Sequence, residues 1–146
     1  MDERFEDCEQ PVTSADLAQW AATHGATIPH AFAEYLLKYN GASLGLDGLV
    51  VGDGVEFSIE RIYSVIHGAP NRLEDVLQRD YRPQGLFPLA RGLGATEFCL
   101  RVEDGAVVYI AYDGTTDAPL PVADSFAGFI EAIVIDDDED DEDDWL

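Results

Sequence analysis

Positive charge is scarce in this chain. One lysine and seven arginines stand against 30 acidic residues among 146, a formal net charge of −22. Nine of the acids form one run at residues 136–144, so the other 137 residues still carry a net −13. Such a charge repels nucleic acid and anionic membranes and steers basic partners into encounter. Solubility alone would also account for an acidic composition, but here the acidity extends well beyond the tail.

Cysteine and long apolar runs are scarce as well. The chain has two cysteines, Cys8 and Cys99, and its first residues are acidic, without the apolar stretch of a leader. We therefore expect free thiols in a reducing cytoplasm. No apolar run approaches the roughly 20 residues that a transmembrane helix needs. The length is that of one ordinary domain with a single core.

Motifs of catalysis and of metal binding are missing too. Neither Ser14 nor Ser125 lies in a Gly-x-Ser-x-Gly elbow, and both fit the start of a helix. The three histidines are scattered and lack the spacing of a zinc helix. Asp113 and Asp117 favour a turn over a calcium loop, because the other ligands are absent. We therefore expect no catalytic residue, cofactor or metal, and a binding module in place of an enzyme.

Apolar residues at helical spacing predict two helices in the first third of the chain. Thr13 and Asp16 form a capping box at the start of the first helix, and Gly25 ends it. The second begins near Pro29 and ends at Asn40, which precedes a glycine. Its apolar stripe comprises Ile28, Phe32, Tyr35, Leu36 and Tyr39.

After residue 42 the pattern changes to the alternation that is typical of strands. Short strands are expected over 49–51 and 55–59, whereas 60–66 suits either a strand or a helix. Asn71 with Glu74 predicts the start of a third helix, which must end before Pro83. Residues 86–90 are interpreted as an edge or strand-entry segment, because Pro88 cannot donate to a ladder.

The clearest hairpin joins residues 96–102 to 106–112. Within it Cys99 alternates with Phe98 and Leu100, so Cys99 faces outward if those two face the core. A last helix should begin at Asp124 or Ser125. Its inward residues are expected to be Phe126, Phe129, Ile130, Ile133 and Val134.

These elements predict an α+β domain over residues 13–135, with a mostly antiparallel sheet and about four helices packed against it. A flexible acidic N-terminus (1–12) is expected to precede it. An acidic tail (136–146) is expected to follow and to be disordered, because carboxylates oppose the dipole at a helix C-terminus and repel one another.

Four segments, in order, resemble the landmarks of the SUKH superfamily, the domain of the yeast Smi/Knr cell-wall regulators. The first is Ile28-Pro29 with Phe32, Tyr35-Leu36 and Tyr39-Asn40-Gly41. The others are residues 87–90, residues 107–110, and residues 122–126 with Phe129. Two positions depart from the family pattern: Ala42 replaces a second glycine, and Gly94-Ala95 stands where Gly-Asp is common. The resemblance implies an α+β domain that binds other proteins.

The resemblance also implies a function. Many bacterial members are immunity proteins, which neutralise a cognate toxin of a polymorphic or contact-dependent system, and these toxins are frequently nucleases. A nuclease presents a basic face that an acidic inhibitor can occupy. We therefore expect a basic toxin domain as the partner, and neither nucleic acid nor membrane. The candidate partner-binding residues are Asp47, Asp53, Glu56, Asp113 and Asp117. A cytoplasmic scaffold or regulator without a toxin partner is the alternative.

The tail provides the first test. Removing residues 136–146 should shift the midpoint of thermal unfolding by no more than about 3 °C, because changes away from the core cost well under ~1 kcal/mol. Circular dichroism of the full and shortened chains measures this shift. A large loss of stability would show that the tail is part of the fold.

Overall fold

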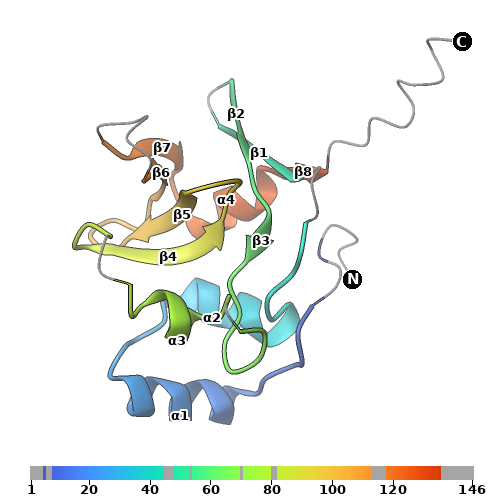
Figure 1. Cartoon of the computed structure of the whole chain (residues 1–146), viewed down its shortest axis with the longest axis vertical. Coiled ribbons are helices and arrows are strands. Elements are labelled where there is room, and N and C mark those ends of the chain that lie inside the picture. The colour runs from blue at the N-terminus through green and yellow to red at the C-terminus, as the bar shows by residue number, and fades with distance from the viewer. Residues whose placement is uncertain are drawn as a thin grey trace, which may run out of the picture.

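The computed structural model describes residue 5 and residues 8–44, 48–52, 54–69, 71–79, 82–112 and 118–135. Within these ranges the chain forms four helices and eight strands (Figure 1). The helices are α1 (Ser14–His24), α2 (His30–Lys38), α3 (Leu73–Val76) and α4 (Phe126–Glu131). The strands are β1 (Gly48–Gly52), β2 (Val55–Ser58), β3 (Arg61–Ile62), β4 (Leu86–Arg91), β5 (Thr96–Arg101), β6 (Val107–Ala111), β7 (Leu120–Ala123) and β8 (Ile133–Ile135).

The strands form two antiparallel sheets. A five-stranded sheet has the order β3-β4-β5-β6-β7, and a three-stranded sheet has the order β2-β1-β8. The chain passes from the small sheet to the large one between β2 and β3. In Figure 1 the β1–β2 hairpin rises above the large sheet, and β8 lies beside β1 of this hairpin. The α+β prediction is confirmed, with two sheets in place of one.

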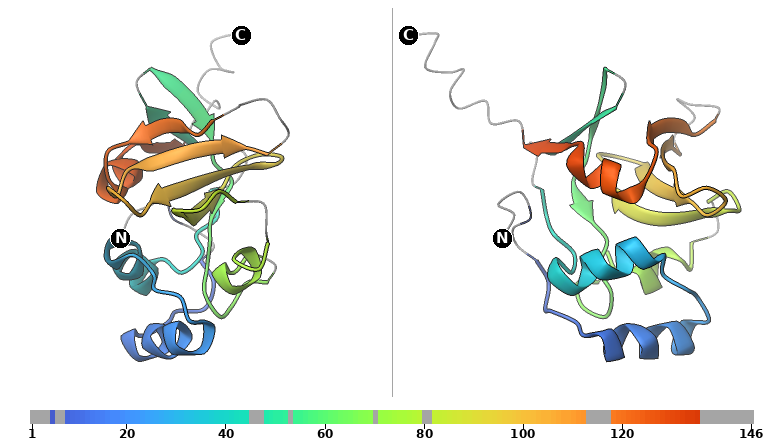
Figure 2. Two further views of the ribbon diagram at one scale, coloured as in Figure 1. Left: turned by 90° about the vertical axis from the view of Figure 1, so that its left-hand side faces the viewer. Right: turned by 180° about the vertical axis from the view of Figure 1, so that it is seen from behind.

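The helices lie mainly on one side of the large sheet. In both views of Figure 2, α2 lies between α1 and the sheet. The capping box of α1 is present: Thr13 N donates to Asp16 Oδ2 (2.9 Å), and Asp16 N donates to Thr13 Oγ1 (3.1 Å). Gly25 ends the helix in the left-handed conformation (φ 62°), as expected.

Aromatic side chains join the layers of the core. Phe32 of α2 is fully buried and contacts Phe87 of β4 and Phe126 of α4. Phe57 of β2 packs against Phe98 of β5, with ring centroids 6.3 Å apart, and so ties the small sheet to the large one. Burial of these large rings supplies much of the hydrophobic stabilisation of a domain of this size.

Two predicted helices are present, but the start of one and the end of the other are wrong. The third helix is a single turn that begins after Arg72, and Glu74 does not cap it, because its carboxylate accepts a hydrogen bond from Ile66 N (3.0 Å). The last helix begins after Ser125 but stops at Glu131. Residues Ile133 and Val134 lie instead in β8, which pairs with β1.

The segment 86–90 is not an edge strand. β4 pairs with β5 along its length and with β3 at Ala90 and Arg91. Pro88 is tolerated because it lies outside the short ladder with β3 and beside an irregularity in the pairing with β5. The ambiguous segment 60–66 contributes only the two residues of β3.

Cys99 is buried and does not face outward, although Phe98 and Leu100 both lie in the main core. Alternation along a strand exposes every second side chain only where the second face of the sheet is solvated. That face instead carries a smaller cluster in which Cys99 packs with Val108 and Ile110. Phe5, from the segment expected to be flexible, is also buried, against Tyr35 and Tyr39. In the described part of the chain no helix is long and apolar enough to cross a membrane.

Candidate functional site

Of the five residues that the sequence suggested for partner binding, the structure describes Glu56. Its side chain is exposed on β2, directly opposite Val51 of β1. The other four, Asp47, Asp53, Asp113 and Asp117, lie outside the described residues. In the sequence Asp47 immediately precedes β1 and Asp53 separates β1 from β2. Three of the five therefore belong to the small sheet or to its direct connections.

The small sheet has two distinct faces, because side chains alternate along each strand. Its inward face carries Val50, Phe57 and Ile133, none more than 6% exposed. We call the opposite side the outward face; it comprises Leu49, Val51, Glu56, Ser58 and Val134. Val51 and Val134 are 41% and 42% exposed. The outward face therefore presents aliphatic side chains and one carboxylate to solvent.

Acidic residues are frequent in the sequence segments that form and flank the strands of this sheet. Residues 47–60 and 133–146 together contain 13 acidic residues and no lysine or arginine. Four arginines elsewhere are paired with acids of the same chain: Arg61 with Glu9, Arg72 with Asp75, Arg82 with Glu97 and Arg101 with Asp104. Half of the few positive charges are thus paired within the chain, and the segments next to the strands of the small sheet are strongly acidic in the sequence.

A second polar feature is buried in the large sheet. The carboxylate of Glu97 accepts two hydrogen bonds from the guanidinium of Arg82, at 2.7 and 2.8 Å. It also accepts one from the hydroxyl of Tyr63 (2.7 Å) and one from Tyr112 (2.8 Å). Both charged side chains are at most 7% exposed. A buried bidentate pair with every oxygen engaged holds Arg82 against β5 of the large sheet.

The protonation states follow from this arrangement. Burial by itself would raise the pKa of Glu97, but the hydrogen bonds and charge of Arg82 outweigh burial and lower that pKa. Burial, reinforced by the charge of Glu97, raises the pKa of the neighbouring Cys99 thiol. Glu97 is therefore a fixed anion and Cys99 a protonated thiol. Neither group is poised for acid–base or nucleophilic chemistry at neutral pH.

A cavity of about 290 Å³ lies beside this cluster and is lined by Tyr63, Arg79, Arg91, Gly94, Ala95, Thr96, Glu97 and Tyr112. The one acid in its lining is already paired with Arg82. Its lining includes Gly94-Ala95, one of the two departures from the family pattern noted above. The lining also includes Arg79 and Arg91. Its described residues do not place a nucleophile in contact with a base. We assign the cluster a structural role.

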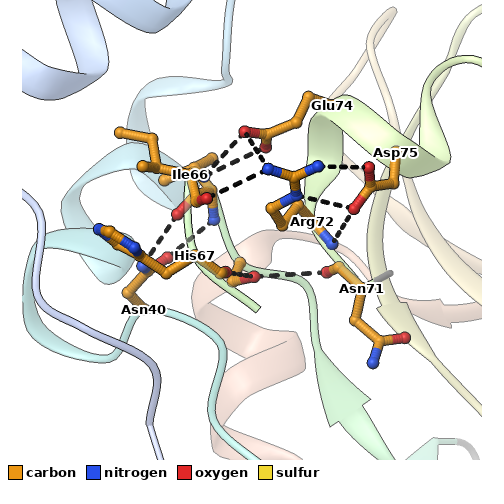
Figure 3. A network of polar contacts seen from close by, with 9 residues as sticks. Asn40, Ile66, His67, Asn71, Arg72, Glu74 and Asp75 are labelled. Atoms are coloured by element: carbon orange, nitrogen blue, oxygen red, sulfur yellow. Dashed lines mark hydrogen bonds and ion pairs between the residues drawn. The ribbon is translucent and has the colours of Figure 1, made fainter. Parts of the chain in front are cut away.

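The family landmark at Asn40 also proves to be structural. Its side-chain amide donates to Val65 O (3.1 Å) and to Gln10 O (2.9 Å), and its oxygen accepts from Val65 N (2.9 Å). Gly41 adopts φ 72°, and a Cβ there would lie 2.6 Å from Ser64 Cβ. Asn40 and Gly41 thus fasten the end of α2 to the segment that follows β3 (Figure 3).

The same network holds a strained residue. Ile66 has φ 69°, a conformation that costs a β-branched residue about 1–3 kcal/mol. The carboxylate of Glu74 accepts from Ile66 N, and a guanidinium nitrogen of Arg72 donates to Ile66 O (3.3 Å). Asp75 in turn accepts two hydrogen bonds from that guanidinium, at 2.8 Å each (Figure 3). The short helix α3 positions these side chains and also buries Leu73 and Val76 in the core.

A larger groove of about 730 Å³ runs between α2 and α4. Its floor is mostly apolar, and charged residues of both signs line it: Glu34, Lys38 and Glu131. Leu37 contributes exposed apolar surface to it. The described residues contain no group of three or more His, Cys, Asp or Glu side chains that could hold a metal ion.

Two antiparallel sheets, with helices packed mainly against the large one, define an α+β domain. The model of the SMI1/KNR4 family (SUKH-1) matches residues 11–132. The chain belongs to this family, which is known for immunity proteins of polymorphic toxin systems. None of the curated proteins matches the chain.

Replacing Asn40 tests the landmark. Asn40→Ala leaves the buried N–H and C=O of Val65 without these partners, and we expect a loss of about 3 kcal/mol in the free energy of unfolding. Gln19→Ala is the control, since its hydrogen bond to Thr23 is exposed; it should cost less than about 0.5 kcal/mol. Urea unfolding measures both. Equal losses would show that the amide of Asn40 is dispensable.

The lowered pKa of Glu97 predicts a pH dependence. Because the folded pKa lies below the ordinary value of 4.5, this carboxylate stabilises the fold above that pH, and the contribution is lost as pH falls through the folded pKa. Glu97→Gln leaves Arg82 buried without a counter-charge and should cost about 3 kcal/mol at pH 7. The difference from the wild type should shrink below pH 4.5.

Urea unfolding at pH 7 and at steps down to pH 3 checks this prediction. The double variant Arg82→Met with Glu97→Leu removes both charges and should recover much of the lost stability. A difference between Glu97→Gln and the wild type that stays constant with pH would contradict the ionic role of Glu97.

Proposed function

We propose that this protein is an immunity protein that neutralises a cognate, basic toxin domain of a polymorphic or contact-dependent system by binding it directly. Membership of the SUKH-1 family carries the proposal. The charge supports it independently, because residues outside the tail run still sum to −13. A nuclease is the kind of toxin that suits this charge best, since it must present a basic surface to its own substrate.

The physical mechanism is occlusion of the toxin's basic surface. Opposite charges accelerate the encounter of the two proteins and align their surfaces before contact. Once bound, the acidic protein occupies the surface on which the toxin would hold a phosphate backbone. No chemical step by the immunity protein is required, which agrees with a Glu97 that is fixed as an anion and a Cys99 that stays protonated.

Co-expression tests the proposal. The toxin domain encoded beside the gene should arrest growth alone and lose its toxicity when this chain is co-expressed. The purified proteins should form a complex, and its dissociation constant should rise at least about 10-fold between 0.1 M and 1 M salt, as the Debye length falls from about 10 Å to about 3 Å. An unrelated protein of similar size and charge is the control and should not protect.

Two outcomes would count against the proposal. If no neighbouring gene encodes a toxin-like domain, or if that domain does not bind, the immunity function fails. If affinity capture from the native cell yields several unrelated partners in place of one, the chain is a scaffold or regulator.

A further inference from the structure

We propose that the outward face of the small sheet is the surface that binds the toxin domain. The toxin would contribute an apolar side chain that is surrounded by basic residues of its own surface. This inference rests on the proposed function and adds the place and the chemistry of the contact. The outward face is the one formed by Leu49, Val51, Glu56, Ser58 and Val134.

Exposed apolar side chains are concentrated on this small sheet. Eight large hydrophobic residues are exposed in the described part of the chain. Four of them, Val51, Val55, Val134 and Ile135, lie in the twelve residues of β1, β2 and β8. The other four are divided among α2, β7 and two turns. Val51 and Val134 lie on the outward face, whereas Val55 and Ile135 occupy the alternate positions that point to the other side of the sheet. Exposed apolar residues that share one face are typical of an interaction site, whereas scattered single ones are not.

The strand register makes the apolar side chains of the outward face contiguous. Leu49 lies opposite Val134 of β8, and Val51, two residues along the same strand, lies opposite Glu56 of β2. Side chains directly opposite in antiparallel strands lie roughly 5 Å apart, so these residues form one strip with a carboxylate at its side. A solvated sheet face normally carries polar residues. The fold does not require this strip, because Val50, Phe57 and Ile133 already fill the core from the other face.

The charge near the small sheet indicates the chemistry of the partner that the outward face can bind. The segments that form and flank the small sheet, residues 47–60 and 133–146, hold 13 acidic residues and no basic one. A partner surface there must be basic to avoid repulsion, and its centre must be apolar to cover Val51 and Val134. An apolar centre with a charged rim is the usual anatomy of a protein interface.

The groove between α2 and α4 is the competing surface, and it fits a basic partner less well. It is lined by Lys38 as well as by Glu34 and Glu131, so its charge is mixed. Of the eight large hydrophobic residues exposed in the described ranges, only Leu37 lines it. The groove therefore enters the experiment as an alternative outcome.

Charge-matched double variants test the surface. Val51→Arg with Val134→Arg adds two positive charges to the outward face, and Leu93→Arg with Val102→Arg adds the same charge at exposed turns of the large sheet. The probe is the catalytically inactive toxin domain encoded beside the gene, titrated by calorimetry. We expect the first variant to bind about 100-fold more weakly than wild type and the second to stay within about 3-fold.

A second set of double variants, with alanine in place of arginine, controls for misfolding caused by the added charges. Val51→Ala with Val134→Ala shortens the strip without adding charge and should weaken binding about 10-fold, while Leu93→Ala with Val102→Ala should leave it unchanged. Thermal unfolding of each variant confirms that the domain is intact.

The outcomes separate the two proposals. If the wild-type protein does not bind the toxin domain, the proposed function fails, and the docking surface with it. If it binds but the two charge-matched variants weaken binding equally, the docking surface alone is overturned. A loss with Leu37→Arg and none with the outward-face variants would place the contact in the groove between α2 and α4.

Discussion

The side-chain amide of Asn40 is the contact on which the connection between helices and sheet depends. It satisfies both backbone groups of Val65 and the carbonyl of Gln10, all at buried or half-buried positions where an unpaired group is costly. The segment that it fastens leads into α3 and includes the strained Ile66. Because α2 carries Phe32 into the middle of the core, fixing the end of α2 also fixes the aromatic packing against β4 and α4.

Sequence patterns could predict what local chemistry determines and little beyond it. The capping box at Thr13, the left-handed Gly25 and the hairpin of β5 and β6 were all predictable, because each depends on a few neighbouring residues. Residues 133–135 were not, since Ile133 and Val134 continue the helical spacing from Phe129 as well as they alternate along a strand. Only pairing with β1, more than 80 residues away in the sequence, decides between the two.

The buried pair of Arg82 and Glu97 illustrates the same limit at a polar site. Nothing in the sequence distinguishes Glu97 from a solvent-facing acid at an alternate position of a strand. Its burial follows from side chains distant in the sequence, Arg82, Tyr63 and Tyr112, which meet its carboxylate on the second face of the sheet. Among the candidate partner-binding residues, the sequence could identify acids near turns. It could not show that Glu56 lies beside an aliphatic strip, because that strip combines residues of β1 and β8, which are far apart in the sequence.

Acidity alone cannot make a binding protein selective, because any basic protein would be attracted to it. Long-range charge raises the rate of encounter, whereas the lifetime of a complex depends on short-range contacts that exclude water. In this chain the two kinds of interaction meet at one place: the acidic segments 47–60 and 133–146 flank and form the sheet that carries Val51 and Val134. If that sheet is the docking surface, charge brings many basic proteins near it. Only a partner with an apolar side chain that fits the strip stays bound, so the aliphatic residues, more than the acids, set the choice of toxin.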